Sequence, residues 1–125
     1  MQTQLETAEA KALATYGPAG INVVPVSVIA VTETEIHLYD FFMGKTVENI
    51  KAEAAVALTA WSGLQGVQVR ATAAYCTEGA VFTAAQTEMQ VRFSDRVLKG
   101  VVVLTPTAVY DISADANRAG TLIVS

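Results

Sequence analysis

The sequence predicts an α+β fold that is mainly β, in which five or six mostly antiparallel strands form a small barrel with two or three helices around it. Segments of strand length that are rich in valine and isoleucine alternate with turns containing glycine and proline. Only three segments have a helical composition. The chain has 125 residues, of which 52 % are hydrophobic and 16 % charged, enough for one continuous core and a single domain over residues 1–125.

The first third of the chain is predicted to contain a helix and a hairpin. Residues 2–14 are rich in Ala, Glu, Lys and Leu and contain no Gly or Pro, which is typical of a helix. After a turn at residues 16–20, the β-branched segment 21–31 predicts a strand, and residues 35–41 predict its returning partner. Pro25 lies inside the first strand and cannot donate to a ladder, so we expect an edge, a bulge or a ligand-facing break there.

The rest of the chain is predicted to hold two helices and three or four strands. The helices are expected at residues 46–53 and 80–93, and the strands at 54–61, 67–77, 99–104 and 108–112. Gln68 and Arg70 fall on one face of the strand 67–77, because side chains alternate along a strand. The tail 113–125 is expected to be partly mobile, with residues 121–124 as an alternative edge strand.

Charge and composition exclude several classes of function. The formal net charge is −4 and the eight Lys and Arg are scattered, which argues against nucleic-acid binding. No apolar run is long enough to span a bilayer and no signal peptide is visible, so no membrane association and a cytoplasmic location are expected. A single cysteine and a single histidine are too few for an internal disulfide or a structural zinc site, and we predict no metal.

The most specific local feature is Gly44-Lys45-Thr46, where a hydrophobic strand breaks and a helix begins. Free backbone N–H groups and the positive end of the helix dipole favour an anion there, and Lys45 adds a full charge. A P-loop is rejected, because its first glycine would fall at Tyr39. From the tripeptide alone, a solvated lysine at an ordinary helix start is the stronger interpretation.

The wider pattern resembles a known family. Four segments carry the likeness: Asn22-Val23-Val24-Pro25-Val26-Ser27, Tyr39-Asp40-Phe41-Phe42-Met43-Gly44-Lys45-Thr46-Val47-Glu48-Asn49-Ile50, Ala55-Val56-Ala57-Leu58-Thr59-Ala60-Trp61 and Gln68-Val69-Arg70-Ala71-Thr72-Ala73. In order and spacing they resemble the pyridoxamine 5′-phosphate oxidase-like family of FMN-binding split β-barrels over residues 12–112. The chain is especially similar to the small single-domain FMN-binding proteins of that family.

The resemblance implies a homodimer of six-stranded antiparallel Greek-key split barrels with two or three peripheral helices and two FMN molecules at the subunit interface. Lys45 and Thr46, after Gly44, match the family's phosphate-binding positions. The segment Val24, Pro25, Val26 and Ser27 matches the strand beneath the isoalloxazine ring. Tyr39, Asp40 and Phe41 match the strand end beside the flavin and its ribityl chain, and Gln68 matches a glutamine that reaches the flavin, usually from the other subunit.

The resemblance also implies a role: an oxidoreductase or electron-transfer protein that moves electrons or hydride through FMN, between a donor and an acceptor that the sequence does not identify. Two alternatives stay open, a flavin-storage protein without catalytic turnover and a module that binds a deazaflavin. Larger oxidases of the superfamily have an arginine where this chain has Gly44, and a basic C-terminal segment that this chain lacks. Both differences argue against oxidation of pyridoxamine phosphate itself. No side chain is identified as a catalytic acid or base.

Overall fold

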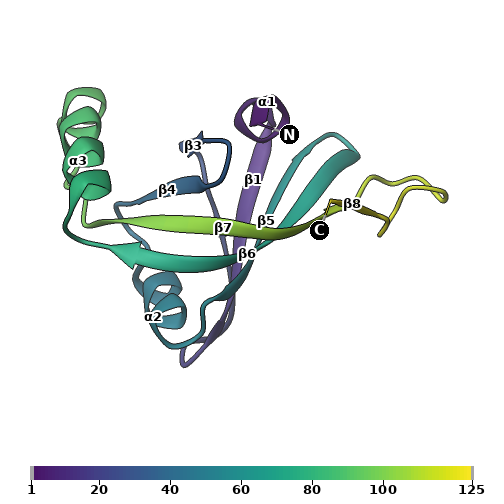
Figure 1. Ribbon diagram of the computed structural model, residues 1–125, viewed down its shortest axis with the longest axis horizontal. Helices are drawn as coiled ribbons and strands as arrows, with labels where there is room; N and C mark the ends of the chain where they lie inside the picture. The colour runs from purple at the N-terminus through teal and green to yellow at the C-terminus, as the bar shows by residue number, and fades with distance from the viewer. Residues whose placement is uncertain (1, 125) are drawn as a thin grey trace.

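One curled antiparallel sheet organises the protein (Figure 1). The computed structural model describes residues 2–124. The strands are β1 (Ala10–Gly17), β2 (Gly20–Pro25), β3 (Ile29–Val31), β4 (Ile36–Asp40), β5 (Ala55–Ser62), β6 (Gln65–Cys76), β7 (Gly100–Asp111) and β8 (Leu122–Val124). They lie in the order β2-β1-β5-β6-β7-β4-β3, and β8 pairs with β7. In the described part of the chain β2 and β3 are the two edges, so the sheet curls without closing.

Three helices surround the described sheet: α1 (Gln2–Thr7), α2 (Gly44–Ala52) and α3 (Ala80–Arg92). Figure 1 shows α3 at one end of the long β6–β7 pair and the C-terminal tail at the other. The helix α2 packs against β1, β2 and β6. The start of α2 is therefore held close to the β1–β2 hairpin.

The core has two parts, one on each face of the β4–β7 region. The larger part fills the concave side of the sheet and includes Leu13, Leu38 and Leu58, all fully buried. The smaller part lies against α3 and consists of Tyr39, Phe41, Ala85, Met89, Leu98, Val101 and Val103. This division explains the uninterrupted run Val101-Val102-Val103-Leu104, because successive side chains of β7 enter different cores and both faces are buried.

The helix expected at residues 2–14 is wrong beyond Thr7. The structure places a strand, β1, from Ala10, and Lys11, Leu13 and Thr15 alternate inward along it. In β1 the chain hydrogen-bonds to β2 on one side and β5 on the other. Pairing on both sides and burial of every second side chain outweigh the weak helical preference of Ala, Lys and Leu.

Two further boundaries differ from the expectation. The strand expected at residues 21–31 is divided into β2 and β3, and the break begins after Pro25, on an edge strand as its chemistry requires. The segments 99–104 and 108–112, expected to form one or two strands, form one, β7, with a bulge opposite Arg70 and Ala71. The described sheet therefore has eight strands, where five or six were expected.

The other sequence predictions agree with the structure. The mainly β class with an antiparallel, barrel-like sheet is confirmed, as are the hairpin of β3 and β4 and the helix α3. The helix α2 begins at Gly44, two residues before the predicted start at 46. In the tail, the structure shows the alternative edge strand, β8; the expected mobility stays a prediction.

Candidate functional site

A cavity of about 300 Å³ opens where the break between β2 and β3 faces the end of β4 and the start of α2. Its lining is mostly apolar. The residues are Val24, Pro25, Val26, Ser27, Val28, Tyr39, Phe41, Phe42, Met43 and Arg96. The cavity thus brings together six residues that the sequence predicted as cofactor contacts, namely Val24, Pro25, Val26, Ser27, Tyr39 and Phe41.

One wall is the segment that leaves the sheet at Pro25. The ladder between β2 and β1 ends where Pro25 pairs with Ala12. One more backbone hydrogen bond follows, from the Val26 N–H to the Lys11 carbonyl at 2.9 Å, before β3 begins at Ile29. Because residues 27 and 28 lie outside the ladder registers, their backbone groups can serve a ligand in the cavity.

The opposite wall is fixed by Asp40, the last residue of β4. Its carboxylate is 3 % exposed and accepts two hydrogen bonds: Oδ1 from the Met43 N–H at 2.7 Å and Oδ2 from the Tyr75 hydroxyl at 2.5 Å. Burial and the bond to Asp40 raise the pKa of the Tyr75 phenol well above its ordinary value, so Tyr75 keeps the proton that it donates. Asp40 therefore holds the turn 41–43, rather than lining the cavity itself.

The cavity adjoins the start of α2 through Met43, which lines the cavity and is the residue before the helix. The Met43 carbonyl accepts from Val47 at 2.8 Å, and Met43 makes no side-chain cap. The N–H groups of Gly44, Lys45 and Thr46 therefore have no intrahelical partner and are available to an anion. Lys45 is exposed and forms no ion pair within residues 2–124.

The Thr46 side chain points inward. It is 1 % exposed, and its Oγ1 accepts a hydrogen bond of 3.0 Å from Asn22 Nδ2 on β2. In this conformation the part of Thr46 that serves an anion at the helix start is its backbone N–H. Its hydroxyl ties α2 to the strand that precedes the cavity wall.

Asn49 fastens α2 to the β1–β2 turn. Its side chain accepts from the Ala19 N–H at 2.8 Å and donates to the Gly20 carbonyl at 2.9 Å and to Thr15 Oγ1 at 3.1 Å. Gly17 lies so close that a Cβ there would meet Asn49 Oδ1 at 2.9 Å. The helix start and the β2 wall are thus held in a fixed relation.

Arg96 is the one cation among the residues that line the described cavity. Its guanidinium lies 4.8 Å from the Phe93 ring centroid and 5.6 Å from that of Phe41. The two rings meet edge to face at 5.7 Å. The local sequence pattern does not identify Arg96 as a lining residue, because the contact between Phe93 and Phe41 joins segments far apart in the chain.

Tyr39 contributes a phenol to the same cavity. It is 9 % exposed, and burial, followed by the nearby Glu88 carboxylate, raises its pKa above the ordinary value. The phenol therefore stays neutral at physiological pH. The site as a whole combines apolar walls, a neutral hydroxyl and a cation with an adjoining helix start that favours an anion. It suits a flat apolar ligand that carries a phosphate.

Gln68 does not line this cavity in the single chain. It lies on β6, opposite Thr59 and Tyr110, and its Oε1 accepts from Arg70 Nε at 3.2 Å. Three further lining residues were not predicted as contacts: Val28, Phe42 and Met43. Each adjoins a predicted segment, so extending the strand-end pattern by one or two residues would have found them.

The described residues contain neither a metal-binding cluster nor a membrane-spanning helix. Within residues 2–124, no group of three or more His, Cys, Asp or Glu residues is placed to hold a metal ion. None of the helices in that range has the length and apolarity that crossing a membrane requires.

Comparison with protein families gives a match over nearly the whole chain. The family model described as pyridoxamine 5′-phosphate oxidase matches residues 1–119. No curated protein matches the sequence.

Solved structures share the fold. HupZ of Group A Streptococcus has a TM-score of 0.82 at 21 % identity, over 97 % of this chain and 95 % of that one. An FMN-binding protein from Syntrophomonas wolfei subsp. wolfei has a TM-score of 0.78 at 17 % identity, over 91 % and 84 %. An F420 reductase has a TM-score of 0.64 at 21 % identity, over 86 % and 94 %. At these identities the likeness shows the split-barrel fold alone.

Proposed function

The chain belongs to the pyridoxamine 5′-phosphate oxidase family, and from that membership and the geometry of the cavity we propose that it is an FMN-binding flavoprotein. FMN, when bound, supplies hydride or electron transfer. The chain's residues bind the cofactor, orient it and exclude water from it. The proposed activity is that of an oxidoreductase or an electron-transfer protein.

The observation that carries the proposal is the junction at Met43, where an apolar cavity adjoins a helix start with free N–H groups. FMN has the same two parts, a flat tricyclic ring and a terminal phosphate. We assign the phosphate to Lys45 and the N–H groups of 44–46, and the ring to the wall 24–27 with Tyr39 and Phe41. We assign Asp40 an indirect role: its carboxylate accepts from the Met43 N–H and so positions the turn 41–43 beside the cavity.

We further propose that the protein is a homodimer and that Gln68 serves the flavin of the partner subunit. The outer face of the β1–β2 hairpin supports a dimer, because Tyr16, Ile21 and Val23 are 64 %, 85 % and 63 % exposed. Small side chains continue that face across the sheet, because Ala14 pairs with Val23 and Ala57 pairs with Ala14. An apolar surface of this kind is unfavourable in water and is typical of an interface. Sedimentation velocity tests this: a dimer supports the proposal, and a monomer at micromolar concentration contradicts it.

A deazaflavin is the second candidate ligand, since the F420 reductase shares this fold and a deazaflavin carries the same two features, a flat tricycle and a phosphate. A flavin-storage role without turnover uses the same site. The cytoplasmic location stays a prediction.

The experiment that tests the proposal is extraction of the ligand from protein as purified, with identification by absorbance and mass. FMN is the expected result. A deazaflavin would replace the proposal by the second candidate. A colourless protein that also takes up neither compound when they are added would overturn both. Oxidation of NADH or NADPH with an artificial acceptor then separates a reductase from a storage protein.

A further inference from the structure

A second, smaller cavity lies beside the one assigned to the flavin. Its volume is about 120 Å³, the liquid volume of about four water molecules at ~30 Å³ each. Gln86 and Gln90 of α3 line it, together with Arg96, Val97 and Leu98. Arg96 lines both cavities, so this residue lies at the boundary between them.

Arg96 is exposed, and its guanidinium lies against two aromatic rings. Its Cζ is 4.8 Å from the Phe93 ring centroid and 5.6 Å from that of Phe41, and the Arg96 N–H donates to the Phe93 carbonyl at 3.0 Å. Within residues 2–124 its side chain forms no ion pair and no hydrogen bond, although Asp95 precedes it. A guanidinium that rests against two rings and has unused N–H groups can bind a planar anion through two parallel hydrogen bonds.

Arg92 shows the contrasting case. It stacks on the same ring, 5.5 Å from the Phe93 centroid, but its Nη1 lies 3.6 Å from Glu88 Oε1. It lines neither cavity. The two arginines therefore share the aromatic contact and differ in the availability of their charge.

The remaining polar groups of the small cavity fit the same ligand. Gln86 and Gln90 are four residues apart, so they lie on one face of α3, and each amide offers two N–H donors. Both glutamines are exposed, and neither amide has a hydrogen-bond partner within the described range. Two amides and one guanidinium around a space of this size suit a carboxylate.

We propose that Arg96, Gln86 and Gln90 bind the carboxylate of a small-molecule substrate or electron acceptor, whose remainder reaches the adjoining flavin cavity. Binding of a carboxylate by these three residues does not depend on the flavin. The role of the pocket in presenting a substrate rests on the proposed function. A protein with this pocket selects carboxylate-bearing reaction partners over neutral analogues of the same shape.

Nuclear magnetic resonance of the full-length ¹⁵N-labelled chain as purified tests the pocket, by observation of the Arg96 Nε–H and the Gln86 and Gln90 side-chain amides. Acetate is expected to give saturable shifts at these groups, and its neutral isostere acetamide is not. Arg96→Gln is expected to weaken the binding of acetate at least about tenfold, because a charge-assisted hydrogen bond is lost. The matched variant Arg92→Gln is expected to leave acetate affinity unchanged.

Several results would overturn the pocket: no saturable acetate shift, equal shifts with acetamide, equal weakening in both arginine variants, or tighter binding of inorganic phosphate than of acetate. The amide spectrum itself reports whether each variant is folded. A chain that binds acetate as expected but neither carries nor takes up FMN would contradict the proposed function and leave the pocket standing. A chain that carries FMN but does not bind acetate would contradict the carboxylate pocket and leave the proposed function standing.

Discussion

The hydroxyl of Tyr75 donates a hydrogen bond of 2.5 Å to Oδ2 of Asp40, so the end of β6 is tied to the end of β4. The strand between them is β7, and its residue opposite Asp40 is Gly100. A Cβ at Gly100 would overlap the Tyr75 ring. Because Gly100 has no side chain, the Tyr75 side chain can pass over β7 and reach Asp40. Asp40 in turn positions the turn that closes the cavity.

The first prediction concerns this tie. Tyr75→Phe is expected to lower the free energy of unfolding by about 1–3 kcal/mol, because one oxygen of a buried carboxylate loses its donor. Denaturant unfolding measures it. Tyr110→Phe is the control, since the Tyr110 hydroxyl has no hydrogen bond within residues 2–124. Equal stability of Tyr75→Phe and the native chain would show that the tie carries no energy.

The second prediction concerns the attachment of α2. Asn49→Ala is expected to lower the free energy of unfolding by roughly 2–4 kcal/mol, since three hydrogen bonds to the β1–β2 region are lost in a fully buried site. Thermal and urea unfolding measure the effect. Glu48→Ala, on the exposed face of the same helix, is the matched control. A loss no larger than the control's would mean that packing alone positions α2.

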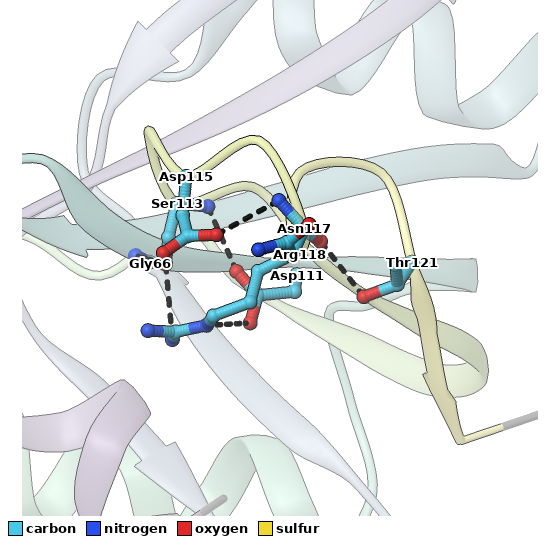
Figure 2. A network of polar contacts seen from close by, with 7 residues as sticks. All are labelled: Gly66, Asp111, Ser113, Asp115, Asn117, Arg118 and Thr121. Atoms are coloured by element: carbon cyan, nitrogen blue, oxygen red, sulfur yellow. Dashed lines mark hydrogen bonds and ion pairs between the residues drawn. The ribbon is translucent and has the colours of Figure 1, made fainter.

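The third prediction concerns pH and the C-terminal tail, whose polar network Figure 2 shows. Asp111 Oδ1 accepts from the Ser113 N–H at 2.8 Å, and Arg118 Nε lies 3.1 Å from Oδ2. The backbone and hydroxyl of Ser113, and then Arg118, lower the pKa of Asp111 below its ordinary 3.8.

A lowered folded-state pKa stabilises the fold above pH 3.8, and this stability is lost as pH falls through the depressed value. The Tm difference between the native chain and Asp111→Asn is therefore expected to be constant above about pH 5 and to shrink in more acidic buffer. Asp95→Asn, at an exposed aspartate with no partner in the described range, controls for general charge effects. A difference that persists unchanged at pH 2 would contradict the role of the ionised carboxylate.

The fourth prediction concerns the phosphate anchor. Lys45→Ala is expected to weaken FMN binding by about 1–3 kcal/mol, because a charge-assisted contact is lost at the helix start. Fluorescence titration of FMN measures it. Lys51→Ala removes the same charge from the last turn of α2 and is expected to leave the affinity unchanged. Undiminished affinity in Lys45→Ala would end the anchor assignment.

Local chemistry made much of this fold predictable. The break after Pro25 depends on proline itself, which cannot donate a hydrogen bond to a strand ladder. The start of α2 was predicted to within two residues from the end of the hydrophobic segment before Gly44. The segments 24–27 and 39–41 were assigned as cofactor contacts through the resemblance to the family, and six of their seven residues line the cavity.

The remainder depends on contacts between distant segments. The segment 10–14 has a helical composition and becomes a strand only because β2 and β5 lie on either side of it. Arg96 joins the cavity because Phe93 packs on Phe41, a contact that no spacing along the chain encodes. The partner of Asp40 likewise comes from β6, through a gap that Gly100 leaves open.

The measurement that tests the central claim most directly is a titration of the ligand-free chain with FMN, observed residue by residue through backbone amide shifts. Saturable binding is predicted, with the largest shifts in two segments, residues 24–28 and 41–46. Gln68 is expected to shift as well if the partner subunit supplies it. Absence of saturable binding, or shifts confined to other parts of the sheet, would contradict the account.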